Sequence, residues 1–171
     1  TNDTPLSGDS TDLAAALAGT INYAGNVTVT NNDYTIAELK AINTGTSGSI
    51  TLSTPTATLS GEVADIVAAF AGSVTINTGA VTISDGTGTD IQATDIATIN
   101  SAITGDITVS SAIDINGSGA DVAAAFTAID TNTGNATAHV TGTDYTVAHL
   151  KTINDKTTGA IVLATPTANL T

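Results

Sequence analysis

The sequence predicts an α/β protein, specifically a strand–helix solenoid with one parallel sheet and short helices on the opposite side. A segment that starts with Gly and then alternates apolar residues with Thr occurs six times, about every 27 residues. Segments with the apolar spacing of helices lie between these strands. Aromatic residues make up only 3% of the chain, so small and β-branched residues must fill thin stacked layers. We call one such strand–helix repeat a coil and expect six coils.

Six strands are expected in the Gly-containing segments. Inward apolar residues alternate with an outward residue, which is Thr in five of the six copies. Strands that are joined by a crossover helix run parallel, so we expect these strands to pair in sequence order as one sheet. The expected strands are 27–30, 50–53, 81–84, 107–110, 136–139 and 161–164.

Two kinds of helix alternate between the strands. The short kind is expected at 12–19, 65–72 and 121–128, and the longer kind at 33–43, 90–100 and 144–154. Apolar residues three or four positions apart share one helix face, which predicts that this face packs on the sheet. The predicted core residues are Leu13, Leu17, Leu39, Ile42, Ile66, Phe70, Ile96, Ile99, Val122, Phe126, Leu150 and Ile153.

The alternation makes the true repeat a double unit of about 55 residues. Three double units, approximately 5–60, 61–116 and 117–171, fill the chain, which starts and stops at the same phase. We therefore expect residues 1–171 to form a single solenoid array that was cut from a longer one. A β-sandwich and a pure parallel β-helix are the alternative folds.

The charge excludes several classes of partner. The net charge is −13, and Lys40, Lys151 and Lys156 are the only basic side chains, so binding to nucleic acid or to an anionic membrane surface is not expected. No cysteine is present to form disulfides. No apolar run reaches the ~20 residues of a membrane span. An acidic surface suits solubility and divalent cations.

Aspartates at the expected helix starts are the most repeated polar feature. The first interpretation is that they are N-caps, whose carboxylates accept hydrogen bonds from free backbone N–H groups. The second is calcium, because carboxylates in Gly-rich loops suit this cation. The expected N-caps are Asp12, Asp33, Asp65, Asp90, Asp121 and Asp144. The candidate calcium ligands, from the loops 85–90 and 114–121, are Asp85, Asp90, Asp114, Asn116 and Asp121.

Two resemblances follow from these strings. The x-G-x-G-x-D strings at 85–90 and 116–121 resemble half of the calcium-binding nonapeptide of RTX proteins, although they lie much farther apart than that family's short period would place them. The whole chain, with its Thr/Ala/Gly/Asn-rich, Cys-free, acidic repeats, looks like the repetitive regions of large secreted or surface proteins of bacteria, such as adhesins and surface-layer proteins. That resemblance implies an extracellular or cell-surface location.

The function expected from the sequence is that of a structural repeat segment without enzymatic activity, a spacer, adhesive or lattice scaffold in a large extracellular protein. The acids are spread at the repeat period instead of clustered as in a catalytic site, and His139 and His149 have no counterpart in the other repeats. The alternative is a calcium-stabilised or surface-binding module. Ice is the least favoured surface, because only Thr28 and Thr30 form a full Thr-x-Thr pair in the strands. The expected partners are neighbouring repeats of the same chain and, by end-to-end self-association, other copies.

Overall fold

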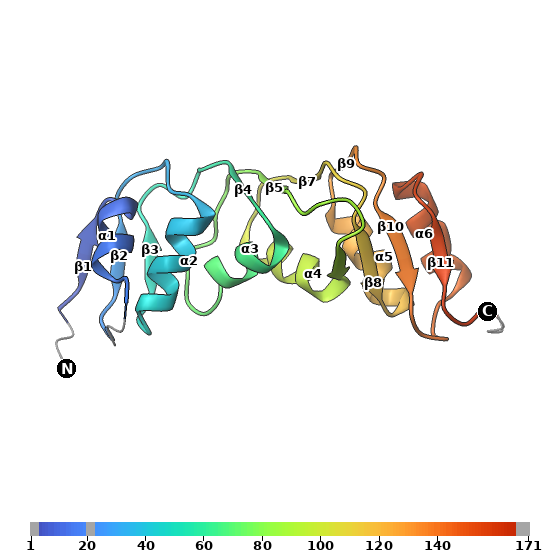
Figure 1. Ribbon diagram of the computed structural model, residues 1–171, viewed down its shortest axis with the longest axis horizontal. Helices are drawn as coiled ribbons and strands as arrows, with labels where there is room; N and C mark the ends of the chain where they lie inside the picture. The colour runs from blue at the N-terminus through green and yellow to red at the C-terminus, as the bar shows by residue number, and fades with distance from the viewer. Residues whose placement is uncertain (1–3, 20–22, 167–171) are drawn as a thin grey trace. The chain divides into compact units, whose positions relative to one another are not determined.

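The computed structural model describes residues 4–19 and 23–166 (Figure 1). Within these ranges the chain is α/β, with six helices and three parallel sheets, none of which closes into a barrel. The α/β class and the parallel strand pairing predicted from the sequence are confirmed. The helices are α1 (Ser10–Ala16), α2 (Ile36–Gly45), α3 (Val63–Ala69), α4 (Ala93–Ala102), α5 (Gly119–Ala128) and α6 (Val147–Lys156).

Each sheet is built from very short strands. The first has the order β1 (Leu6–Gly8), β2 (Val27–Val29), β3 (Ile50–Leu52). The second has the order β4 (Leu59–Gly61), β5 (Val81–Ile83), β7 (Ile107–Val109), β9 (Thr131–Asn132). The third has the order β6 (Asp90–Gln92), β8 (Asp114–Gly117), β10 (Thr137–Val140), β11 (Ile161–Leu163).

The prediction of one sheet with the six strands in sequence order is wrong. Extended segments directly before the helices, such as β4 and β8, also pair, and they flank β5 and β10. Three of the five expected neighbour pairs do form: β2 with β3, β5 with β7, and β10 with β11. The pairs of β3 with β5 and of β7 with β10 do not form, because a strand has only two edges. β4 and β7 occupy both edges of β5, and β8 and β11 occupy both edges of β10.

Close backbone approach requires five of the six glycines that open the expected strands; the sixth, Gly25, faces the Tyr23 side chain. A Cβ atom added at Gly48 would lie closer than 3.0 Å to the carbonyl oxygen of Gly25, and one added at Gly105 would meet Gly79 in the same way. None of these glycines has a positive φ. Glycine is therefore used here because one segment lies directly on the next, and not for an unusual backbone angle. The same crowding against backbone occurs at Gly79, Gly134 and Gly159.

Contacts divide the chain into two compact units, Thr1–Val81 with Ser101–Gly105, and Thr82–Asn100 with Asp106–Thr171. In the first unit α1 packs on α2 and α2 on α3, and in the second α5 packs on α6 (Figure 1). The prediction of a single array stays a prediction.

The predicted core is mostly confirmed. In β2, Val27 and Val29 are buried and Thr28 between them is partly exposed, and β3, β5 and β7 show the same alternation. Ten of the twelve predicted helix residues are buried. Phe70 and Leu150 are half-exposed instead. Phe70 is the C-cap of α3, beyond its last turn.

Two buried threonines, Thr46 and Thr157, each form a hydrogen bond to a neighbouring segment. The Oγ1 atom of Thr46, the C-cap of α2, donates to the carbonyl oxygen of Gly25 at 2.9 Å and accepts from the N–H of Gly48 at 3.0 Å. Thr157, the C-cap of α6, donates to the carbonyl oxygen of Ala136 at 2.7 Å. The α6 segment therefore repeats the α2 segment in its hydrogen bonds as well as in its sequence.

Candidate functional site

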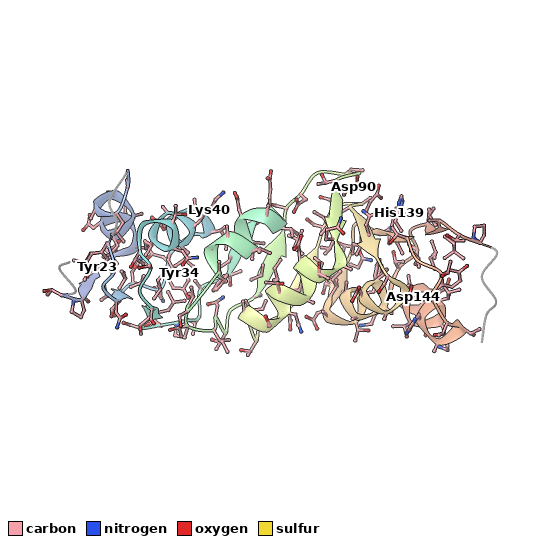
Figure 2. All side chains as sticks on the ribbon, turned by 90° about the horizontal axis from the view of Figure 1, so that it is seen from below. Tyr23, Tyr34, Lys40, Asp90, His139 and Asp144 are labelled. Carbon is pink, nitrogen blue, oxygen red and sulfur yellow. The ribbon has the colours of Figure 1, made fainter. Side chains whose placement is uncertain are left out.

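The outward face of the sheet β6-β8-β10 gathers several polar residues. The register places Asp90 beside Asp114, and Asn116 between Gln92 and His139. Asn116 Nδ2 donates to Asp90 Oδ1 at 3.1 Å. Asp90 and His139 are labelled in Figure 2. The inward residues between these rows are buried and apolar: Ile91, Ile115 and Ala138. The structure therefore brings together three of the five candidate calcium ligands.

The fit to calcium is partial. Calcium takes six to eight oxygen ligands, and in the part of the chain that the structure describes no three His, Cys, Asp or Glu side chains converge in a way that could hold a metal ion. Asp85 is buried after β5. The carboxylate of Asp121 accepts a hydrogen bond from the Ser118 hydroxyl at 2.7 Å. Calcium binding stays a prediction, centred on Asp90, Asp114 and Asn116.

The six predicted N-caps are not N-caps. Asp12, Asp65 and Asp121 lie instead in the first turn of α1, α3 and α5, where their charge still complements the helix dipole. Asp33 and Asp144 stand two residues before the caps of α2 and α6, and Asp90 starts β6. The residues at the N-cap positions are Asp9, Thr35, Glu62, Ser118 and Thr146, of which Glu62 makes no capping hydrogen bond.

Glu38 joins α1 to α2, a role that sequence reasoning missed. Its carboxylate accepts hydrogen bonds from the hydroxyls of Thr11 at 2.7 Å and Ser10 at 3.1 Å, and from the backbone N–H of Thr35 at 2.9 Å. Burial alone would raise the pKa of Glu38, but the hydrogen bonds from Thr11, Thr35 and Ser10 outweigh it and lower the pKa. The signal was present as the capping-box pattern T-x-x-E at 35–38.

The second copy of this arrangement lacks the carboxylate and the two hydroxyl donors of the preceding helix, but it keeps the backbone donor. His149 of α6 occupies the place of Glu38, and its Nδ1 accepts from the backbone N–H of Thr146 at 3.3 Å. The preceding helix, α5, begins with Gly119 and Ala120, whereas α1 begins with a serine and a threonine. The change at His149 thus accompanies the loss of the hydroxyls that a carboxylate would accept from.

A buried polar pair lies beneath α2. The Tyr34 hydroxyl donates to Asn77 Oδ1 at 2.8 Å, and Asn77 Nδ2 donates to the carbonyl oxygens of Ala57 at 2.9 Å and Gly79 at 3.2 Å. Burial raises the pKa of Tyr34. Within the described ranges, no buried side-chain nitrogen or oxygen lacks a hydrogen-bond partner. These polar groups are therefore used to hold the fold together.

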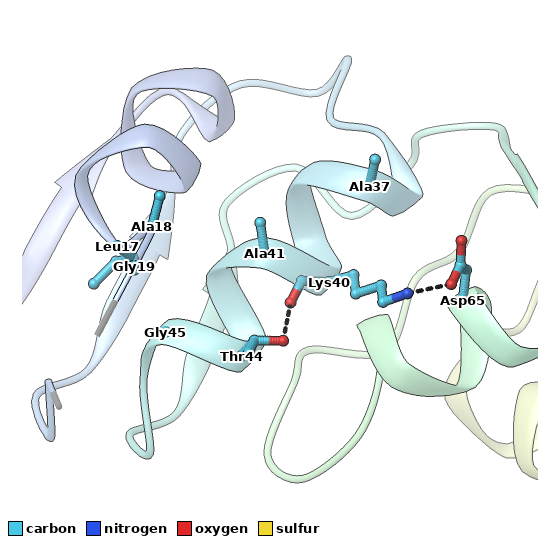
Figure 3. A pocket seen from close by; sticks show the side chains of 9 residues that line it. All are labelled: Leu17, Ala18, Gly19, Ala37, Lys40, Ala41, Thr44, Gly45 and Asp65. Atoms are coloured by element: carbon cyan, nitrogen blue, oxygen red, sulfur yellow. Dashed lines mark hydrogen bonds and ion pairs between the residues drawn. The ribbon is translucent and has the colours of Figure 1, made fainter. Parts of the chain in front are cut away.

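An open pocket of about 400 Å³ lies beside α2 (Figure 3). Its lining is mostly apolar and small. The charged groups on it are Lys40 of α2 and Asp65 of α3, which form an ion pair with each other. The other lining residues are Leu17, Ala18, Gly19, Ala37, Ala41, Thr44 and Gly45.

Comparisons with protein-family models, with curated protein sequences and with solved structures gave no match. Among the helices of the described residues, none has the length and apolar character to cross a membrane.

Proposed function

We propose that this chain is a structural repeat segment without enzymatic activity, a strand–helix solenoid that serves as a spacer, adhesive or lattice scaffold in a large extracellular protein. The observation that carries the proposal is the use of the repeated residues. The glycines that open the strands give one segment room to lie on the next, and Thr46 and Thr157 bond across the same step. Repeated residues that serve contacts between neighbouring segments are typical of a scaffold protein.

The polar chemistry supports the same proposal. The hydrogen bonds of Glu38, Tyr34 and Asn77 join segments of this chain that are distant in sequence. The pocket beside α2 holds one closed ion pair. Structural use of the titratable groups favours a scaffold over a catalyst.

Force spectroscopy on a single molecule tests the proposal. A solenoid is stabilised mainly by nearest-neighbour contacts, so it should unfold in several steps. Each step should release roughly 90 Å of chain, because a coil of about 27 residues extends by ~3.4 Å per residue. A single event that releases the whole chain would contradict the scaffold of stacked coils.

A calcium-stabilised module is the second candidate, and the pairing of Asp90 with Asp114 beside Asn116 favours it. Calcium should then raise the melting temperature of the wild type and EDTA should remove the gain. Asp90→Asn with Asp114→Asn should abolish the calcium effect, whereas Asp12→Asn, a change at an exposed aspartate on α1, should keep it. Equal melting curves in calcium and EDTA would reject this candidate.

A further inference from the structure

The contact between α2 and α3 shows how one helix of this chain covers the next. Lys40 of α2 forms an ion pair with Asp65 of α3 (Figure 3). Asn43 of α2 donates from Nδ2 to the carbonyl oxygens of Ala68 at 2.7 Å and Ala71 at 3.0 Å, near the end of α3. One cation and one amide on α2 thus recognise an acid and two carbonyls on the α3 segment.

Helix α6 presents the same groups as α2. Lys151 and Asn154 stand where α2 has Lys40 and Asn43, and both helices begin with a threonine N-cap. Lys151 pairs with Asp155 of its own helix and its side chain is 72% exposed. The two matching segments are DYTIAELKAIN (33–43) and DYTVAHLKTIN (144–154).

Helix α1 presents the same groups as α3. Asp12 stands where α3 has Asp65, and Ala15 and Ala18 stand where α3 has the two alanines whose carbonyls accept from Asn43. Asp12, Ala15 and Ala18 are all exposed. The two matching segments are LSGDSTDLAAALAG (6–19) and LSGEVADIVAAFAG (59–72).

The apolar residues of α6 are uncovered where those of α2 are covered. Val147 of α6 is 55% exposed, whereas its counterpart Ile36 is 4% exposed. Leu150 is half-exposed, whereas its counterpart Leu39 is fully buried. The backbone of Gly61 in β4 lies against Ile36, and β4 belongs to the same segment as α3. The face of α6 that carries Val147 and Leu150 is therefore as apolar as the buried face of α2, although it is partly exposed.

The strand β11 also has less cover than its counterpart β3. In β3, the N–H of Ile50 donates to the carbonyl oxygen of Ser73 at 2.8 Å, and the carbonyl oxygen of Ile50 accepts from the N–H of Thr75 at 3.0 Å, so the following segment pairs with this strand. Ile161 is the counterpart of Ile50. Among the described strands β11 pairs only with β10, at the end of its sheet, and Ile161 and Leu163 are half-exposed.

We propose that a second copy of this chain docks on the α6–β11 end with its α1–β1 end, in the way that α3 covers α2. Lys151 then pairs with Asp12 of the second copy, and Asn154 donates to the carbonyls of its Ala15 and Ala18. The contact joins two different surfaces, so each copy keeps one free surface and further copies add in a row. The inference rests on the proposed scaffold function and names its partner.

Charge favours this pairing although both copies are acidic. Lys151 and Lys156 place two of the chain's three basic side chains on α6, against one acid of that helix, Asp155. Asp9 and Asp12 place two acids at the start of α1. Because the local charges are opposite, the α1 end of one copy is attracted to the α6 end of another. Two α1 ends, or two α6 ends, repel each other.

Sedimentation equilibrium over a wide range of concentration tests the proposal with the 171-residue chain. The wild type should show masses that rise with concentration in multiples of 16.8 kDa.

Lys151→Glu and Asp12→Lys each set like charges opposite each other and should weaken association roughly 3- to 30-fold. An equimolar mixture of the two variants should recover association, because each end then meets an opposite charge. Asn154→Ala should weaken association without a change of charge.

Lys156→Glu is the matched control, since it makes the same charge change on α6 at a position with no counterpart in the α2–α3 contact. It should weaken association less than Lys151→Glu. Circular dichroism checks that each variant is folded. A constant mass of 16.8 kDa at every concentration, equal effects of the two lysine variants, or no recovery in the mixture overturns the proposal. A chain that stays monomeric but unfolds in several steps under force overturns this inference and leaves the scaffold function standing.

Discussion

The glycines that precede β3, β5, β7, β10 and β11 set how closely neighbouring segments lie. Gly48→Ala should lower the free energy of unfolding by roughly 1–3 kcal/mol, because the new methyl group has to push apart two backbones. The carbonyl of Gly25 is the group in the way, and a backbone carbonyl cannot turn aside as a side chain can. Urea denaturation measures the loss.

Gly86→Ala is the matched control for this prediction. Its added Cβ would meet only the Thr89 side chain, at 3.8 Å, so the free energy of unfolding should change by less than about 0.5 kcal/mol. Equal losses in the Gly48 and Gly86 variants would show that close approach is not the reason for glycine at the strand starts.

The two phenylalanines test how far periodicity predicts burial. Phe126 is 1% exposed, so Phe126→Ala should cost about 3–5 kcal/mol. Phe70 occupies the same place in its helical pattern but is half-exposed as the C-cap of α3, and Phe70→Ala should cost clearly less. Thermal and urea unfolding of both variants measure the difference. A larger loss at Phe70 than at Phe126 would contradict the packing.

At the scale of elements, Glu38 links the stability of α1 and α2 to pH. The pKa of Glu38 is lowered in the folded protein from its ordinary value of 4.5. The ionised carboxylate therefore stabilises the fold above pH 4.5, and this contribution is lost as the pH falls through the lower folded value. Glu38→Gln should be less stable than the wild type at pH 7, by under about 1 kcal/mol for a partly exposed group. The difference should shrink as the pH falls through the folded pKa.

Glu62→Gln serves as the control for this prediction. Glu62 stands at the N-cap position of α3 and makes no capping hydrogen bond. Glu62→Gln should therefore lower the free energy of unfolding at pH 7 by less than Glu38→Gln does. Equal losses in the two variants would show that the hydrogen bonds from α1 contribute nothing to stability.

Sequence patterns predicted the elements better than their caps and pairing. The alternation in β2 and β3 marked both strands and their buried faces. The caps were misassigned because Asp33 and Asp144 recur so regularly, although Thr35 and Thr146 carry the hydroxyls that reach the helix N–H groups. Sheet partners were predicted in part: β2 with β3, β5 with β7, and β10 with β11 pair as expected. The other two pairs were predicted wrongly, because β4 and β8 occupy the edges of β5 and β10 that they would need.

Three residues of the candidate site were predicted from the sequence, but the secondary structure that holds them was not. Asp90, Asp114 and Asn116 were expected in loops, as calcium-binding strings would have them. They lie in β6 and β8 instead, held in register by Ile91 and Ile115 beneath them. Strand pairing therefore decides which of the five candidates meet, and Asp85 and Asp121 do not share these strands.

At the scale of the whole molecule, stability should depend on how many neighbours each strand has. In the second unit β8 and β10 have a paired strand on both sides and β11 on one side only, and in the first unit β2 lies between β1 and β3. Opening a strand with one neighbour breaks one interface, whereas opening one between two neighbours breaks two. Native-state hydrogen exchange should therefore show slower exchange in β2, β8 and β10 than in β1 and β11. Raising the protein concentration should slow exchange in β1 and β11 together, since a second copy would cover both ends. Equal protection of all of these strands at every concentration would mean that each unit opens as one cooperative body, and the stacked arrangement of nearly independent segments would be wrong.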